Sequence, residues 1–287
     1  MEKSVRIISN KLKERDRIKQ NKIKEYNVFC FDMDMPGNQK VLKQLFRFDV
    51  AGNRIEKKLY DKLGVLYWKE IASYDDLYRK IESAGYNGEH SIEWKRIYKY
   101  DSIGLRVERN ILNANGELEK IRKNKFNEKG KLIEEIEYDA EGNVEWREVS
   151  MYDDNGNRIE KTKYQFNGKI DFKEVAKYDE NDNRVEEIRY DVDGKIDWRD
   201  KAIYDENGNL IERIWYKLNG KTDWSWHAKY DNKNNMIETE EYDSKGKIDF
   251  KKTIEYDSKG NRSKTIEWDV LKNKPKMVSE YKYEYYN

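Results

Sequence analysis

A unit of 26 residues recurs along this chain without a slip, and it restricts the fold more than any other feature of the sequence. The first position is aromatic in all nine units: Phe48, Tyr74, Tyr100, Phe126, Tyr152, Tyr178, Tyr204, Tyr230 and Tyr256. The thirteenth position holds Tyr60, Tyr86, Leu112, Tyr138, Tyr164, Tyr190, Tyr216, Tyr242 and Trp268. Such a period is typical of arrays in which each unit packs on its neighbours. We therefore expect one repetitive domain rather than two globular ones.

Two turns divide each unit into halves of 12 and 14 residues. In the unit that starts at Tyr204, the first turn is Asp205–Asn209 (DENGN) and the second is Lys217–Gly220 (KLNG). Glycine tolerates positive φ, Asn-Gly favours tight hairpin loops, and an aspartate at the turn start can accept hydrogen bonds from the backbone. The unit thus predicts two antiparallel strands of ordinary length, and the nine units predict roughly 18 strands.

Alternating residue types favour strands over helices. In the unit that starts at Tyr178, one face is expected to hold Tyr190, Ile196, Trp198, Ala202 and Tyr204. The opposite face is expected to hold Lys195, Asp197, Arg199 and Lys201. One face of the sheet is then mostly aromatic and aliphatic, and the other is mostly charged. A column of glutamates is expected on the aromatic side: Glu56, Glu82, Glu108, Glu134, Glu160, Glu186, Glu212 and Glu238.

The composition favours a thin sheet over a deep core. Hydrophobic residues make up 37% of the chain and charged residues 40%, against roughly 45–50% and 25% in ordinary globular domains. Aromatic residues reach 13%, which argues against disorder. Because neighbouring strands twist by about 20–25° and open sheets beyond about ten strands curl, the predicted fold is all-β. We expect an elongated, twisted antiparallel meander, a single-layer or coiled open sheet with its aromatic face concave.

The ends of the array depart from the repeat. Residues 1–25 are compatible with an N-terminal helix or irregular cap, and residues 26–287 form the predicted repeat domain, with regular units at 100–269. The apolar spacing in residues 74–85 favours an inserted helix. Pro275 and its neighbouring lysines are typical of a blunted sheet edge, so the last strand is expected to be an open edge.

Charge and cysteine content narrow the classes of partner. The net charge of +1 gives no global field that would favour nucleic acid or an anionic membrane. Lone Cys30 excludes an internal disulfide. No apolar run has the length of a transmembrane helix, and the first 30 residues lack the apolar stretch of a signal peptide. The chain as given is compatible with the cytoplasm, or with secretion or the envelope after removal of a signal peptide; the oligomeric state stays open.

The acidic turns admit a calcium interpretation. Asp153–Asn157, Asp179–Asn183 and Asp191–Gly194 each place several oxygens close together, as Ca²⁺ requires. They lack the closing bidentate glutamate of a calcium loop, and hairpin turn chemistry accounts for the same residues. We expect no metal site and no other cofactor.

The twenty-first position of the unit forms an aromatic column: Trp68, Trp94, Trp146, Phe172, Trp198, Trp224 and Phe250. Candidate binding residues among them are Trp146, Phe172, Trp198, Trp224 and Phe250, because exposed aromatic rings stack on sugars and on bases. Acidic residues as numerous as the basic ones argue against nucleic acid. Cross-strand aromatic packing, which is worth about 0.2–1 kcal/mol per pair, is the interpretation of this column that we favour over ligand binding.

The sequence offers no set of residues with the spacing of an active site. The glutamate column is repeated in eight units, whereas a pair of catalytic carboxylates needs one particular environment. Opposite lysines and arginines on neighbouring strands account for it more simply. His90 and His227 lack metal-ligand spacing, and Cys30 lies in an apolar strand. We expect no catalytic residues and no enzymatic activity.

The recurring YD-x-x-G-[NK]-x-[IV]-E, as in Tyr152–Glu160 and Tyr204–Glu212, resembles the YD repeats of RHS-type bacterial proteins. The alternating Tyr-x-x-x-Gly-Lys hairpins look like those of MORN-like repeat proteins. The resemblance covers residues 48–269 and implies a tandem β-hairpin array. RHS-type repeats build a spiral shell around a toxin, which would imply a scaffold here, but the chain is short and carries no recognisable toxin domain or self-cleavage segment.

The sequence as a whole predicts a non-enzymatic scaffold with an extended protein–protein interaction surface. The expected partner is another protein, bound along a sheet face or at an edge by strand addition. The alternative is a carbohydrate- or envelope-binding module that uses exposed aromatic residues. Burial of Trp198 and Trp224 under neighbouring side chains favours the scaffold, and their exposure in a groove favours the alternative.

Overall fold

The computed structural model of the chain describes residues 14–33 and 40–287. Strands make up 63% of these residues and helix 3%, which confirms the all-β prediction. The strands are β1 (Ile23–Asp32), β2 (Val41–Phe48), β3 (Arg54–Tyr60), β4 (Leu66–Tyr74), β5 (Lys80–Asn87), β6 (Ile92–Tyr100), β7 (Arg106–Leu112), β8 (Leu118–Phe126), β9 (Leu132–Asp139), β10 (Val144–Tyr152), β11 (Arg158–Gln165), β12 (Ile170–Tyr178), β13 (Arg184–Tyr190), β14 (Ile196–Tyr204), β15 (Leu210–Tyr216), β16 (Thr222–Tyr230), β17 (Met236–Tyr242), β18 (Ile248–Tyr256), β19 (Arg262–Asp269) and β20 (Lys274–Tyr285).

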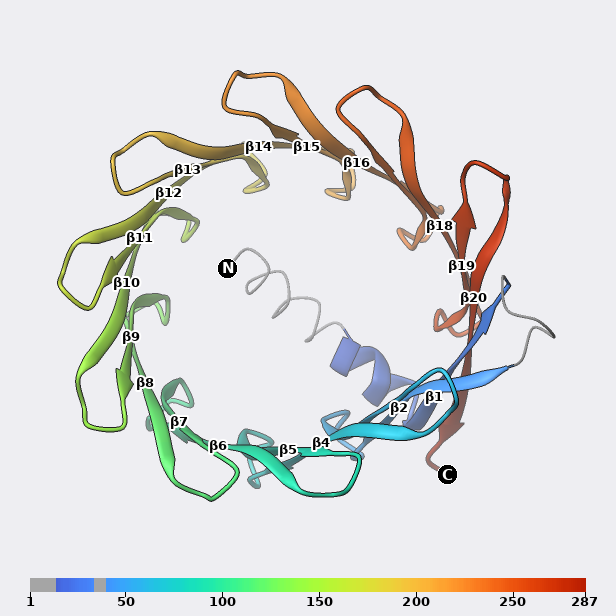
Figure 1. Cartoon of the computed structure of the whole chain (residues 1–287), viewed down its shortest axis with the longest axis horizontal. Helices are drawn as coiled ribbons and strands as arrows, with labels where there is room; N and C mark the ends of the chain where they lie inside the picture. Colours follow the sequence, from blue (N-terminus) through green and yellow to red (C-terminus); the bar gives the residue numbers. More distant parts are fainter. Residues whose placement is uncertain (1–13, 34–39) are drawn as a thin grey trace.

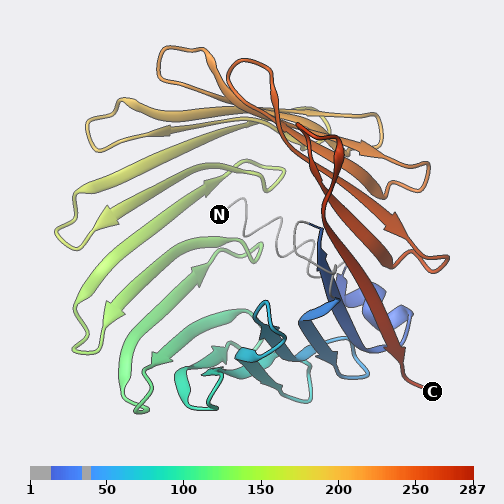
Figure 2. The ribbon, with the colours of Figure 1, turned by 45° about the vertical axis from the view of Figure 1, so that its right-hand side comes forward.

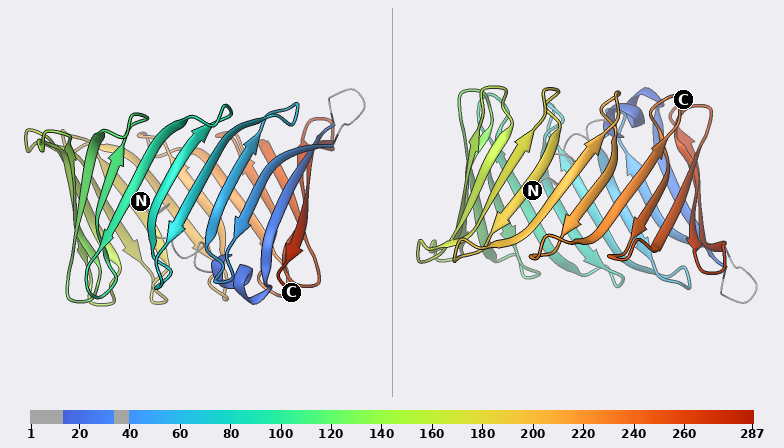
Figure 3. Two further views of the ribbon diagram at one scale, coloured as in Figure 1. Left: turned by 90° about the horizontal axis from the view of Figure 1, so that it is seen from below. Right: turned by 90° about the horizontal axis from the view of Figure 1, so that it is seen from above.

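The strands form one 20-stranded antiparallel sheet, in which each strand pairs with its neighbours in sequence. β1 also pairs with β20, from Ile23 opposite Tyr285 to Asp32 opposite Met277. The sheet therefore closes into a barrel, seen along its axis in Figure 1 and from the sides in Figures 2 and 3. The expectations of an open meander and of an open edge at β20 are wrong: Pro275 lies in a strand with a partner on both sides.

The sheet closes into a barrel for a physical reason that cannot be seen in a single repeat unit. The nine units supply β3 to β20, and two further strands, β1 and β2, precede them. Twist accumulated over so many strands brings the two ends of the sheet together. Pairing between the first and last strands then satisfies backbone N–H and C=O groups that an open sheet would leave at its edges.

The first turn of each unit has the predicted chemistry. In Asp205–Asn209, one carboxylate oxygen of Asp205 accepts hydrogen bonds from the backbone N–H groups of Asn207 and Asn209, at 3.0 and 2.7 Å. Its other oxygen accepts one from the Asn209 side chain at 2.9 Å. Gly208 has φ 74°, a conformation that glycine adopts without a steric penalty.

The helix expected in residues 74–85 is absent, and a turn followed by β5 takes its place. Asp75 accepts hydrogen bonds from the N–H groups of Leu77 and Arg79, as the aspartates of the other units do. Tyr78 stands where glycine usually stands and adopts φ 60°. The helical prediction was wrong because it took the missing glycine for a missing turn.

The assignment of faces needs one correction. The pairing shifts between Arg189 and Tyr190, so that Trp198 lies opposite Arg189 while Tyr190 lies opposite Ile196. The extra residue of this β-bulge changes which side chains share a face. Trp198 consequently shares a face with Arg189, and Tyr190 projects from the other side. The same shift recurs in the other units. The glutamate column and the tryptophan column therefore lie on different faces of the sheet, not on the same face as predicted.

Tyrosines at the first position connect successive units. The Tyr204 hydroxyl donates a hydrogen bond of 3.1 Å to the backbone carbonyl oxygen of Arg184, which begins the preceding unit's first strand. The same bond is made by Tyr74 to Arg54, Tyr100 to Lys80, Tyr152 to Leu132, Tyr178 to Arg158, Tyr230 to Leu210 and Tyr256 to Met236. This bond accounts for the tyrosine at seven of the nine first positions; Phe48 and Phe126 occupy the other two.

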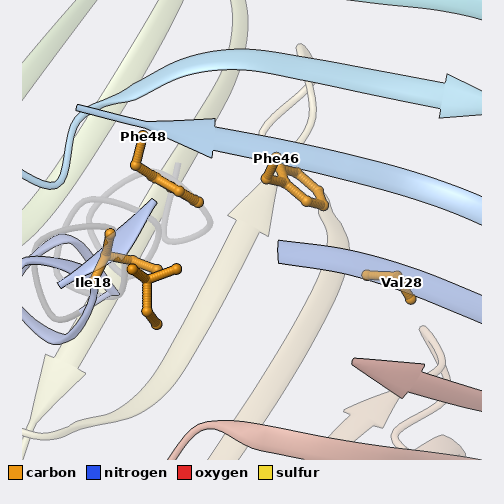
Figure 4. Packing of buried hydrophobic residues seen from close by; sticks show 5 residues of the cluster. Ile18, Val28, Phe46 and Phe48 are labelled. Atoms are coloured by element: carbon orange, nitrogen blue, oxygen red, sulfur yellow. The ribbon is translucent and has the colours of Figure 1, made fainter. Parts of the chain in front are cut away.

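A helix at residues 14–20 lies inside the barrel at one rim (Figures 1 and 3). Its Ile18 is fully buried and belongs to a cluster of buried residues that also includes Val28, Phe46 and Phe48, all labelled in Figure 4. Because the helix lies within the ring of strands, the face that carries these side chains is the inner face. The N-terminal cap was predicted over residues 1–25; the part before residue 14 lies outside the described residues.

Candidate binding surface on the inner face

The predicted aromatic column lies on the inner face of the barrel. In the strand register, each candidate binding residue lies opposite a residue of the preceding strand. These pairs are Trp146 and Glu137, Phe172 and Lys163, Trp198 and Arg189, Trp224 and Trp215, and Phe250 and Glu241. Phe172 is 7% exposed, and the other four are half-buried. The expected concave placement of the aromatic face therefore holds for this column.

Neighbouring side chains pack on two of these rings, Phe172 and Trp224. The Arg189 guanidinium lies 3.6 Å from the centre of the Phe172 ring. Trp224 stacks on Trp215 with 3.8 Å between ring centres and 8° between planes. Guanidinium–aromatic and ring–ring contacts of this kind stabilise a sheet without any ligand. For Phe172 and Trp224, this geometry matches the packing interpretation.

Trp146 shows how tightly the inner face is bonded. Its indole N–H donates a hydrogen bond of 2.9 Å to Glu137, a residue that is only 5% exposed. Arg122 donates to the same carboxylate and lies 4.7 Å from the centre of the Trp146 ring. Burial acts to raise the pKa of Glu137, but its hydrogen bond and charge interaction with Arg122 prevail and hold that pKa below the ordinary value.

A second series of inner-face residues occupies the tenth and twenty-third positions of the units, and we call it the inner ladder. Its members face each other across neighbouring strands: Lys57 and Glu70, Ser83 and Arg96, Arg109 and Arg122, Glu135 and Glu148, Lys161 and Glu174, Glu187 and Asp200, Arg213 and Trp226, Thr239 and Lys252. No repeat motif marked these positions, because their residue type changes from unit to unit while the rest of the unit is constant.

Most charges of the inner ladder are compensated. Lys161, 4% exposed, lies 2.8 Å from a carboxylate oxygen of Glu174. Asp200 is fully buried and accepts hydrogen bonds from both Arg184 and Arg213. Buried charges need such partners because removal from water is costly. These acidic residues are held by structural contacts rather than presented to a substrate.

The glutamate column lies on the outer face, where each member contacts a basic residue of a neighbouring strand. Glu186 binds Lys177 at 2.9 Å and also Arg199; Glu238 lies 2.6 Å from Lys229 and 2.9 Å from Lys251. The Lys229 hydrogen bond holds the pKa of Glu238 below its ordinary value. Seven of the eight glutamates thus pair with a lysine or arginine as predicted, and Glu212 instead lies 3.8 Å from His227.

The first carboxylates of two of the acidic turns accept hydrogen bonds within their own turns. Asp153 and Asp179 each accept hydrogen bonds from the backbone and the side chain of the asparagine four residues later. Within residues 14–33 and 40–287, no group of three or more His, Cys, Asp or Glu side chains is arranged to hold a metal ion. His227 contacts Ser225 at 3.1 Å, and the Cys30 sulfur lies 3.2 Å from the Ser279 hydroxyl.

A pocket of about 600 Å³ opens on the outer face beside β17, β18 and β19. Trp268, Glu238, Glu240, Lys251 and Leu271 contribute to its lining. The Trp268 indole donates to the Thr253 hydroxyl at 3.2 Å, which fixes the ring. Sequence patterns predict no site at Trp268, because it occupies the thirteenth position of the repeat, which is normally tyrosine.

No family model matches the chain, and no curated protein matches it. Among solved structures, a porin-like protein from Bacteroides uniformis aligns over 91% of this chain and 98% of its own, with 10% identity and a TM-score of 0.38. The TcdB2-TccC3 structure aligns over 82% of this chain with 13% identity and a TM-score of 0.33, and the chain spans only 16% of that protein. A protein of unknown function from Bacteroides fragilis aligns over 47% of this chain and 88% of its own, with 16% identity and a TM-score of 0.23.

These likenesses leave the chain without an assigned family, and what stands is an all-β array of hairpin repeats. As to helices, none in the described part of the chain combines the length and the apolar character needed to cross a membrane.

Proposed function

We propose that this protein is a non-enzymatic scaffold that binds another polypeptide on the inner face of its barrel. One observation carries the proposal: the inner face already holds a polypeptide segment, the helix at residues 14–20. Ile18 of that helix is fully buried against Phe46 and Phe48. Arg15 donates a hydrogen bond of 3.3 Å to the backbone oxygen of Ala51 in a rim turn. The same kinds of contact are available to a partner.

The rest of the inner face fits a polypeptide as well. It combines half-buried aromatic rings with residues of both charges, as polypeptide-binding surfaces do. The barrel also changes the expected mode of binding. In the described part of the chain, the first and last strands pair with each other. Strand addition at an edge therefore has no free edge to use, and binding along the inner face is the mode that we propose.

Site-specific photo-crosslinking tests this proposal. A photoreactive phenylalanine analogue replaces Trp198 on the inner face of β14 in one variant and Tyr216 on the outer face of β15 in another. Arg199, the neighbour of Trp198, lies opposite Tyr216, so the two probes sit close together but on opposite sides of one sheet. We expect a polypeptide to crosslink in the native cells through position 198 and not through position 216. Crosslinking through position 216 alone, or equally through both, would contradict inner-face binding.

The pocket beside Trp268 supports a second candidate, carbohydrate binding on the outer face. An indole fixed by Thr253 together with the carboxylates of Glu238 and Glu240 provides a stacking surface and hydrogen-bond acceptors for sugar hydroxyls. A glycan array probed with the native protein and with Trp268→Ala tests it. Glycan binding that the substitution abolishes would favour this candidate, and no glycan binding would eliminate it.

A further inference from the structure

On the inner face of four consecutive strands, β5 to β8, no basic residue forms an ion pair with a carboxylate of the same four strands. Strand register places on this face Lys80, Ser83, Gly85, Asn87, Trp94, Arg96, Tyr98, Tyr100, Arg106, Arg109, Ile111, Lys120, Arg122 and Asn124. Flanking strands compensate part of this charge. Glu70 of β4 lies 3.8 Å from Lys80, and Glu137 of β9 binds both Lys120 and Arg122. Three arginines remain between them.

These three residues, Arg96, Arg106 and Arg109, form the arginine cluster. No carboxylate of the described residues forms an ion pair with any of them. Arg109 lies directly opposite Arg122, and like charges in that position repel each other. Burial, followed by the charges of Arg122, Arg106 and Arg96, lowers the pKa of Arg109 to about 10.

Aromatic side chains hold the arginine cluster in position. Trp94 lies flat on Gly85, where a Cβ atom would come within 2.4 Å of the indole ring. The Arg96 guanidinium stacks on that indole, 4.0 Å from the ring centre. Arg106 lies 5.7 Å from the ring centre of Tyr98. Ordered guanidinium groups lose less side-chain entropy when they bind a ligand.

The cluster has hydrogen-bond donors without acceptors. The Nε atoms of Arg96 and Arg109 are buried and have no hydrogen-bond partner. Elsewhere on the inner face, a carboxylate accepts a hydrogen bond from the Nε atom, as Asp200 does for Arg213. A buried donor without an acceptor is costly. A bound acceptor with negative charge would remove both the orphan donors and the repulsion.

We propose that the arginine cluster binds a doubly charged oxyanion of the phosphate class. Three guanidinium groups need more than one negative charge to balance them, and phosphate presents several oxygens that match the fork of N–H donors on arginine. Free phosphate and a phosphate monoester share this chemistry. The proposal does not rest on the polypeptide partner proposed above, because it is argued from residues of β6 and β7 alone.

Calorimetric titration of the full chain with inorganic phosphate tests the proposal, at pH 8, where phosphate is a dianion, and against sodium chloride of equal ionic strength. O-phosphoserine titrated in parallel tells a monoester from the free ion. The variants are Arg96→Gln and Arg109→Gln. Arg147→Gln is the matched control, because it removes one arginine from the outer face, where Arg147 pairs with Glu134 and its side chain is 49% exposed.

We expect saturable binding of phosphate or of phosphoserine that chloride does not reproduce. Each inner-face substitution should weaken that binding at least about tenfold, the loss of one charge-assisted contact, and the control should not. The unliganded Arg109→Gln protein should melt at the same or a higher temperature than the native one, because like-charge repulsion is relieved. Phosphate binding that equals the chloride effect, or that survives both inner-face substitutions, would overturn the proposal.

Discussion

The Tyr152 hydroxyl donates a hydrogen bond of 2.8 Å to the backbone carbonyl oxygen of Leu132, which lies 20 residues earlier in the chain. Leu132 begins β9 and Tyr152 ends β10, so one side chain closes a complete hairpin. The equivalent bond recurs around the barrel, and burial raises the pKa of the Tyr152 hydroxyl. The tyrosine at the first position of the unit therefore has a structural role, because it joins the two ends of a hairpin.

Tyr152→Phe should lower the free energy of unfolding by about 0.5–1.5 kcal/mol, because the Leu132 carbonyl loses its partner while the ring stays in place. Urea unfolding at neutral pH measures this. Tyr190→Phe is the matched control, since Tyr190 occupies the thirteenth position on the outer face. An equal loss in both variants would show that the hydroxyl bond is not what distinguishes the first position.

Alkaline pH should destabilise the barrel through the same tyrosines. Burial raises the pKa of Tyr74 to about 12, whereas an unfolded tyrosine ionises near about 10. The contribution of Tyr74 is therefore complete below pH of about 10 and is lost as pH rises from there towards about 12. Absorbance at 295 nm during an alkaline titration should show tyrosines that ionise only as the protein unfolds. Complete ionisation near pH 10 with the far-UV circular dichroism unchanged would contradict this.

Acid should weaken the first turns. The hydrogen bond from the Asn209 side chain, and those from the backbone, hold the pKa of Asp205 below its ordinary value. Because the folded-state pKa is the lower one, this stabilisation is present above the unfolded pKa of about 3.9 and is lost as pH falls through the folded value. Asp205→Ala should therefore destabilise the protein at pH 7 and have little effect near pH 2. Glu206→Gln, in the same turn, serves as the control and should behave like the native protein at both pH values.

Chelation should leave the melting temperature unchanged. The turn carboxylates of Asp153 and Asp179 are occupied by N–H donors of their own turns. A metal bound only to the folded state would stabilise it, so its removal would lower the melting temperature. Differential scanning calorimetry with and without EDTA measures this; a fall of several degrees would restore the calcium interpretation.

The sequence predicts what is local and repeated. The turns, the strands and the constant tyrosine follow from Asp, Asn-Gly and aromatic residues at fixed positions. The prediction of a helix at residues 74–85 was wrong because Tyr78 replaces the glycine that usually marks the turn. The assignment of side chains to the two faces was wrong because a β-bulge beside Tyr190 interrupts the alternation of side chains between the faces. No residue type in the sequence predicts this bulge.

Closure and the arginine cluster could not be predicted in the same way. Pairing of β1 with β20 depends on twist summed over the whole sheet and on two strands that lie outside the regular units. Arg96 and Arg109 occupy variable positions of the unit, so their convergence becomes visible only when register places both on one face. The repeat defines the scaffold, and departures from it define the candidate sites.

Barrel closure is the central claim, and a single engineered thiol tests it. Cys30 of β1 lies directly opposite Ser279 of β20, and it is the only cysteine in the chain. Ser279→Cys should therefore form an intramolecular disulfide with Cys30 under mild oxidation and leave no reactive thiol in the monomer. Thr265→Cys, one strand further away on β19, should keep both thiols. Quantitative loss of both thiols in the first variant alone is the predicted result; two free thiols in oxidised, monomeric Ser279→Cys protein would mean that the sheet stays open.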